Sequence, residues 1–140
     1  MFKKLFKKEK KDNDNKNILI IALLIHAAKS DEMYTSEEKK IIIKAIIQLN
    51  NVNSQEAEKL LKIAEKKEAE ANQIVEFTRE IKKYSMDFRL KIIEIIWKIV
   101  YSDGASDSYE SNLIRRICGL LYISDKDSGI IKTKVLNSLR

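Results

Sequence analysis

The stretch 90–100 is apolar on nearly every side, and the chain is organised around it. Its only charged residues, Lys91, Glu94 and Lys98, recur three and four positions apart along one stripe. Because a helix turns every 3.6 residues or so, that stripe is the one face that would meet water. The spacing predicts a helix buried on most sides. A second apolar stretch, 18–28, predicts the first core helix, since a bilayer span takes about 20 apolar residues.

Four further segments repeat the spacing i, i+3, i+4, i+7, which places apolar residues on one buried helical face. The predicted faces consist of Ile42, Ala45, Ile46 and Leu49; Ala57, Leu60, Leu61 and Ala64; Ile74, Phe77, Thr78 and Ile81; and Ile114, Ile117, Cys118 and Leu121. A last helix is expected to bury Ile131, Val135 and Leu139. Polar residues near the helix starts are expected to serve as N-caps, namely Ser54, Asn72, Ser85 and Ser124.

The composition favours a single helical domain. The 140 residues, 44% of them hydrophobic, are enough to bury a core. Three glycines and no proline leave little turn chemistry for hairpins. We therefore expect an all-α fold, a single compact bundle of about seven helices over residues 18–140, preceded by a flexible lysine-rich tail, residues 1–17. The single cysteine excludes an internal disulfide framework and a multi-thiolate metal site.

The positive charge is concentrated in the tail. Seven lysines and three acidic residues give residues 1–16 a charge of +4, which leaves +2 of the net +6 for the other 124 residues. A nearly balanced body argues against nucleic acid as a partner. Two interpretations of the tail are open. The simpler is a disordered solubilising segment. Alternatively, Phe2, Leu5 and Phe6 among lysines would make weak contact with an anionic membrane, placing a cytoplasmic protein peripherally on it.

Two acidic turns, 72 residues apart and in the same phase, carry the candidate chemistry: Asp31, Thr35 and Glu38 in the first, and Asp103, Asp107 and Glu110 in the second. In each turn the last two positions fit a capping box, in which the first side chain bonds the N3 amide and the glutamate reaches back. Capping does not explain Asp31 and Asp103. Each follows a predicted helix, where a carboxylate meets the negative end of the helix dipole.

Two explanations of these aspartates are open. Each could accept hydrogen bonds from free amides of the next helix, or the turns could hold a hard cation such as Ca²⁺ or Mg²⁺, which takes oxygen ligands. The second turn is not an EF-hand, because its glycine comes second and its glutamate comes too early. The candidate metal ligands are Asp31, Glu38, Asp103, Asp107 and Glu110.

The remaining residues of interest have structural interpretations. We expect His26 to be partly buried and satisfied, and Cys118 to be inert packing. Trp97 and Tyr101 are expected at the core or its edge, and the charges of 56–70 on a solvated outer face. No nucleophile–base pair, phosphate loop or histidine–carboxylate pair is visible, so the sequence argues against an enzyme.

Several segments resemble the tellurite-resistance TerB-like family: IWKIVYSDG (96–104), Asp107, Glu110, LIRRI (113–117), LLYISD (120–125), FTR (77–79) with Ile81, and AAKSD (27–31) through Glu38. The resemblance covers about residues 18–138. It implies an all-helical domain of about seven helices without established catalytic activity, found in stress-response and metal-related systems. It also implies a metal site at Asp31, Glu38, Asp103, Asp107 and Glu110. Thr35 departs from the acidic pattern, and Glu32 stands where glycine is expected.

From these observations we expect a non-enzymatic helical module built from two related halves. It would bind a divalent cation, an unknown protein partner, or both, in a stress or metal response of the tellurite type. The alternative is a purely structural protein-interaction domain whose acidic turns only cap helices.

Overall fold

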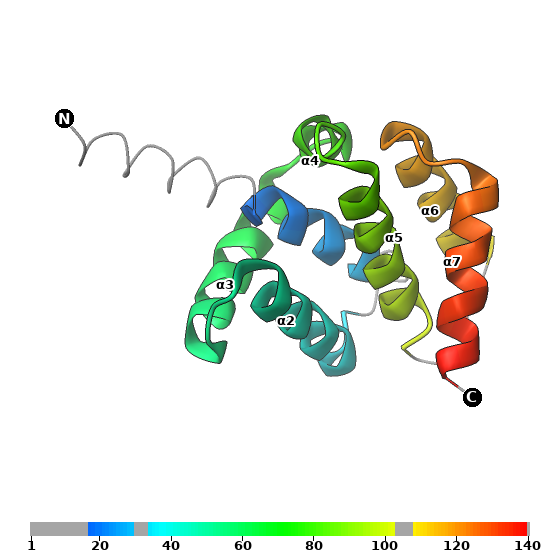
Figure 1. Ribbon diagram of the computed structural model, residues 1–140. Coiled ribbons are helices and arrows are strands. Elements are labelled where there is room, and N and C mark those ends of the chain that lie inside the picture. The colour runs from blue at the N-terminus through cyan, green and yellow to red at the C-terminus, as the bar shows by residue number, and fades with distance from the viewer. Residues whose placement is uncertain (1–16, 30–33, 103–107, 140) are drawn as a thin grey trace.

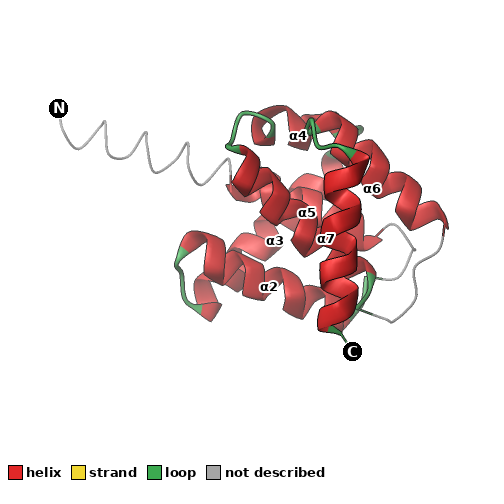
Figure 2. Ribbon diagram, turned by 45° about the vertical axis from the view of Figure 1, so that its right-hand side comes forward, coloured by secondary structure: helices red, strands yellow, loops and turns green. Residues whose placement is uncertain are grey.

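The computed structural model describes residues 17–29, 34–102 and 108–139, with only the backbone described for 108–111. Within these ranges the chain forms seven helices. Figure 2 shows helices and loops and no strand among the described residues. The first, which we call the N-terminal helix, covers residues 17–28. It is followed by α2 (Ser36–Asn50), α3 (Ser54–Glu70), α4 (Val75–Ile81), α5 (Met86–Val100), α6 (Ser108–Leu120) and α7 (Asp125–Ser138). The predicted all-α bundle is confirmed.

Two apolar helices lie inside the bundle. The N-terminal helix (blue in Figure 1) runs between the α2–α3 pair and α4, and every residue from Ile20 to Ile25 is at most 2% exposed. Helix α5 packs against α2, α6 and α7. Its predicted solvent-facing stripe is confirmed, because Lys91 and Lys98 are exposed and Glu94 is half-buried. The stretch 90–100 therefore shares the centre of the molecule with the N-terminal helix.

The helix bounds repeat with the 72-residue period seen in the acidic turns. The N-terminal helix ends at residue 28 and α5 ends at residue 100, while α2 begins at Ser36 and α6 begins at Ser108. Helix α4 has no counterpart in this scheme. Helix α3 begins at Ser54 and α7 begins at Asp125, so each of the two related halves contains three helices, with an acidic turn between the first and the second.

The four predicted apolar faces point inward, although Leu49 and Leu60 are only partly buried. Two predicted caps are also present. The Phe88 amide donates to Ser85 Oγ at 3.3 Å, and the Asp127 amide donates to Ser124 Oγ at 3.1 Å. These features depend on residues three or four apart, which the helical period brings together without help from the rest of the fold.

Two predicted caps are wrong. Helix α3 is capped by Asn53, whose Oδ1 accepts from the Glu56 amide at 2.9 Å, and Ser54 is already inside the helix. Either residue has a suitable side chain, and the structure uses the earlier one. Asn72 does not cap α4, because the N-cap is Ile74, which makes no side-chain cap bond. Ile74 is 4% exposed, so core packing places it there.

The predicted inner face of α7 needs one correction. Val135 is buried and Ile131 is partly buried, but Leu139 is 59% exposed. Residues spaced i, i+4, i+8 drift around a helix, since four residues exceed one turn of about 3.6. The face runs instead through Ser128, which is 6% exposed and lies three positions before Ile131.

Candidate functional site

The first acidic turn ends in a complete capping box. Thr35 Oγ1 accepts from the Glu38 amide at 3.1 Å, and Glu38 Oε1 accepts from the Thr35 amide at 2.9 Å. The pair satisfies two of the free amides at the start of α2. Glu38 is only 5% exposed, so its carboxylate is held at a fixed position beside the core. The predicted capping role of this candidate metal ligand is confirmed.

The other four candidate ligands are not placed by their side chains. Asp31, Asp103 and Asp107 lie outside the described residues, and Glu110 lies in the first turn of α6, where only the backbone is described. Among the side chains that the structure describes, no group of three or more histidine, cysteine, aspartate or glutamate residues could hold a metal ion. The five-carboxylate site therefore stays a prediction.

The described ends of the two acidic turns meet at one groove. This groove has a volume of about 390 Å³ and lies between α2, α5 and the end of α7. Glu37, which precedes Glu38, and Ser102, which precedes Asp103, both line it. In Figure 1 the start of α2 and the ends of α5 and α7 lie on the same lower side of the molecule. The fold thus brings the helix ends that flank the two turns to one place.

Sequence reasoning missed Glu68, whose side chain turns inward from α3 and is 10% exposed. Its Oε2 accepts from Lys29 Nζ at 2.8 Å, and its Oε1 lies 3.3 Å from His26 Nδ1. One carboxylate thus joins α3 to two residues at the end of the N-terminal helix. The prediction that all charges of 56–70 face solvent is wrong at this position. The prediction that His26 is partly buried and satisfied is confirmed.

The sequence did contain a signal for Glu68. The buried residues of α3 are Ala57, Leu61 and Ala64, and Glu68 follows four positions after Ala64 on the same face. A glutamate in register with a buried face needs a partner, because a buried charge without one is costly. Its partners come from a helix about 40 residues earlier, and local periodicity carries no information about them.

Tyr34 stands beside this cluster. Lys39 Nζ lies 4.7 Å from the centre of its ring, which is within the range of a cation–π contact. Burial raises the pKa of Tyr34 well above its ordinary value, and the nearby carboxylates of Glu65, Glu38 and Glu68 raise it further. In the described part of the chain its buried hydroxyl makes no hydrogen bond. The phenol therefore stays neutral near physiological pH.

The other singled-out residues have packing roles. Trp97 is 5% exposed, donates from Nε1 to Ser128 Oγ at 3.2 Å, and stacks on Tyr101 at 5.7 Å between ring centres. Cys118 is 1% exposed, and burial raises the pKa of its thiol. A higher pKa disfavours the thiolate, which is the reactive form of cysteine. Neither residue offers chemistry to a ligand.

Fold and site together define an all-helical module of two related halves, each containing one acidic turn. The family model described as tellurite resistance protein TerB matches residues 17–133, and the chain belongs to this family. None of the curated proteins and none of the solved structures compared with the chain matches it. Among the described residues, no helix is long and apolar enough to cross a membrane.

Proposed function

We propose that this TerB-family module acts by binding rather than by catalysis, and that its two acidic turns hold a hard divalent cation. The observation that carries the proposal is that Glu37 and Ser102, one from beside each turn, line the same groove. If the carboxylates of the two turns converge there, they would repel one another, and a cation would relieve that repulsion. In a tellurite-type stress response, the cation would couple the two halves of the domain.

The donor set fits such a cation by its chemistry. Every candidate ligand is a carboxylate, and oxygen ligands suit Ca²⁺ and Mg²⁺. Asp103, Asp107 and Glu110 would form the main part of the site, joined by Asp31 and Glu38. The cation would supply charge and rigidity.

A melting experiment tests this proposal. Millimolar calcium, magnesium or manganese should raise the melting temperature relative to protein in a chelator, because a ligand selective for the folded state stabilises it. Asp103→Asn should abolish the rise. If none of the three cations shifts the melting temperature, the cation site is wrong.

The second candidate is a structural protein-interaction domain whose acidic turns only cap helices. It is favoured by the complete capping box of Thr35 and Glu38. Glu38→Gln separates the two candidates, because glutamine also serves at the N3 position of a capping box but carries no charge. Under the capping candidate neither the parent nor this variant changes its melting temperature when a cation is added. Under the cation candidate the cation stabilises the parent, and it stabilises this variant less.

A further inference from the structure

We propose that the groove between α2, α5 and the end of α7 is a docking site for an amphipathic helix with an acidic flank, supplied by a partner protein. We call it the α2–α5 groove. The residues that carry the proposal are Ile41, Lys44, Ala45, Ile95, Lys98 and Leu139. The groove also adjoins the two acidic turns, but the residues proposed to bind the helix differ from the proposed cation ligands, and the helix site does not require a bound cation.

The floor and one edge of the α2–α5 groove are apolar. Ala45 and Ile95 close the floor at 4% and 8% exposure, and Ile41 is partly buried beside them. Leu139, at the end of α7, is 59% exposed at the edge. A large aliphatic side chain open to water beside an apolar floor gains from being covered by apolar groups of a partner.

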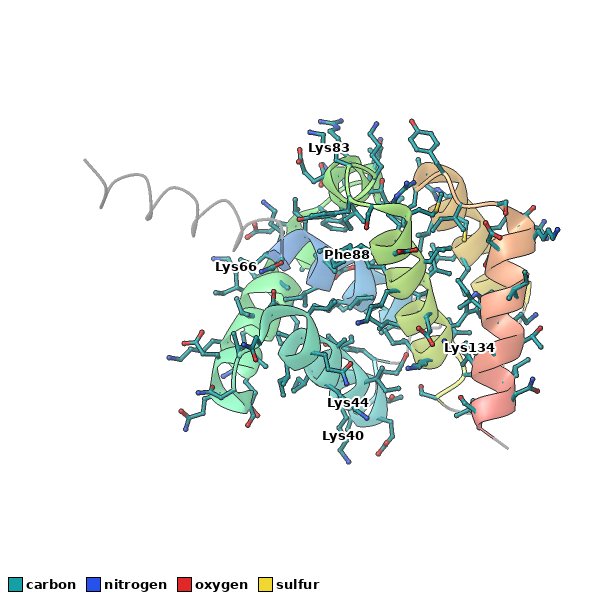
Figure 3. The ribbon with its side chains drawn as sticks, viewed as in Figure 1. Lys40, Lys44, Lys66, Lys83, Phe88 and Lys134 are labelled. Carbon is teal, nitrogen blue, oxygen red and sulfur yellow. The ribbon has the colours of Figure 1, made fainter. Side chains whose placement is uncertain are left out.

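The described charged residues of the α2–α5 groove are two lysines and one glutamate, so their net charge is positive. Lys44 and Lys98 line the groove and are exposed, and neither forms an ion pair with any described residue. The carboxylates nearby are already engaged: Glu37 accepts from Lys40 at 3.3 Å, and Glu94 lies 3.2 Å from Lys134 Nζ. Figure 3 shows Lys40 and Lys44 projecting from the outer side of α2. Two lysines without an ion pair to any described residue, beside an apolar floor, favour a partner with acidic residues flanking an apolar stripe.

The surroundings favour a helix as the bound element. The walls of the groove are helices, and an amphipathic helix places its apolar face into such a groove through side chains spaced i, i+3, i+4 and i+7. The described part of the chain has no strand whose edge could pair with an extended peptide. A volume of about 390 Å³ accommodates a few anchoring side chains.

Charge also argues against the protein's own tail as the occupant. Residues 1–16 carry Phe2, Leu5 and Phe6, but their seven lysines would face Lys44 and Lys98. Like charges across an interface disfavour binding. An acidic partner avoids this repulsion.

The test uses the full chain and a fluorescent helical peptide, in a chelator so that no bound cation can bridge the peptide to the acidic turns. The probe carries leucines spaced i, i+3, i+7 flanked by glutamates, and its matched control replaces each glutamate by lysine. Fluorescence anisotropy should show binding of the acidic peptide at least about tenfold tighter than binding of the basic one, and added salt should weaken it. Methyl resonances of Ile41, Ile95 and Leu139 should shift on titration.

Variants locate the site. Lys44→Glu with Lys98→Glu should weaken binding of the acidic peptide about tenfold or more, and Leu139→Ala should weaken it a few-fold. The matched control, Lys62→Glu with Lys66→Glu on exposed positions of α3, changes the net charge equally and should leave the affinity within about twofold. Circular dichroism checks that each variant is folded.

Several outcomes would overturn the proposal. They are absence of binding at hundreds of micromolar, equal affinity for both peptides, and equal losses in the groove and control variants. A dimer in sedimentation that the groove variant dissociates would assign the α2–α5 groove to a second copy of this chain instead.

Discussion

The two halves of the molecule share the same helix spacing, but matched positions differ in residue type and in burial. The solvent-facing stripe of α5, formed by Lys91, Glu94 and Lys98, corresponds 72 residues earlier to Leu19, Ala22 and His26. In the first half this stripe is mostly covered, since Ala22 is fully buried and the partly buried His26 meets Glu68 of α3. In the second half Lys98 lines an open groove. The comparison teaches that the same stripe of a helix can pack against the core in one half and line a groove in the other.

The sharpest way to break this comparison is to exchange charges between matched positions. Ala22→Glu places a carboxylate where no water reaches, and we expect a loss on the order of 3–5 kcal/mol in the free energy of unfolding. Glu94→Ala removes a carboxylate whose partner Lys134 is 72% exposed, and should cost about 0–1 kcal/mol. Urea denaturation measures both. Similar losses would show that the two stripes are equivalent after all.

The contact between α3 and the end of the N-terminal helix can be tested at Glu68. Glu68→Ala removes the acceptor of Lys29 and the partner of His26, and should cost about 1–3 kcal/mol because the carboxylate is nearly buried. Glu70→Ala, at an exposed position of the same helix, is the matched control and should stay within about 0.5 kcal/mol. Chemical denaturation would contradict the proposed bridge if the two variants lost the same amount.

The cap of the first acidic turn should be worth less than that bridge. Thr35→Ala removes the acceptor of the Glu38 amide, and we expect a loss of about 0.5–2 kcal/mol in unfolding free energy. Thr35→Ser keeps the oxygen and serves as the control. In the second half, Asp107→Ala is expected to show a loss of the same size if that turn also caps its helix. A thermal melt that does not separate Thr35→Ala from Thr35→Ser would argue against the cap.

Replacing Tyr34 should change the free energy of unfolding less than the substitutions above, and the change should depend on pH. Burial raises the pKa of its phenol in the folded state, so the unfolded chain releases this proton first as the pH rises. The stabilisation of the folded state by the neutral phenol is present below about pH 10 and is lost progressively above it. Tyr34→Phe should change stability by less than about 1 kcal/mol at pH 7, because the hydroxyl makes no described hydrogen bond, and should lessen the alkaline loss. Melts at pH 7 and above pH 10 test this, and an unchanged alkaline loss would contradict it.

The tail, which has no counterpart in the second half, should affect stability least. A chain that begins at Asn17 should keep its cooperative melt and its free energy of unfolding within about 0.5 kcal/mol, since the described helices lie after residue 16.

We also expect the full chain to bind anionic vesicles more than neutral ones, with salt weakening the binding. Equal partitioning of full and shortened chains in a co-sedimentation assay would remove the membrane role.

Much of the fold could be predicted because its signals are local. The faces through Ile42, Phe77 and Ile117 depend only on spacing along the chain, and each faces inward. The errors arise where local rules allow neighbouring choices or where tertiary structure decides. Asn53 and Ser54 are both able to cap α3, and only the structure selects one.

The site was less accessible to sequence reasoning. Helical spacing placed Glu68 on the buried face of α3, but its charge suggested solvent exposure and its partners lie in a distant helix. The α2–α5 groove is formed by segments up to about 100 residues apart, from Glu37 to Leu139. A groove between helices cannot be predicted from the spacing of residues along one segment. The capping box of Thr35 and Glu38 was predictable because both of its bonds span only three residues.

The run of buried residues from Ile20 to Ile25 has a consequence for biosynthesis. Every other described helix comes later in the chain, so this apolar run is made before any of the helices that will surround it. At about 5–20 residues per second, several seconds pass between its synthesis and that of α5. During this interval it is exposed to aggregation, and charged residues beside such a run act as gatekeepers. The seven lysines of residues 1–16 stand directly before it and would keep the nascent chain soluble until its core is complete.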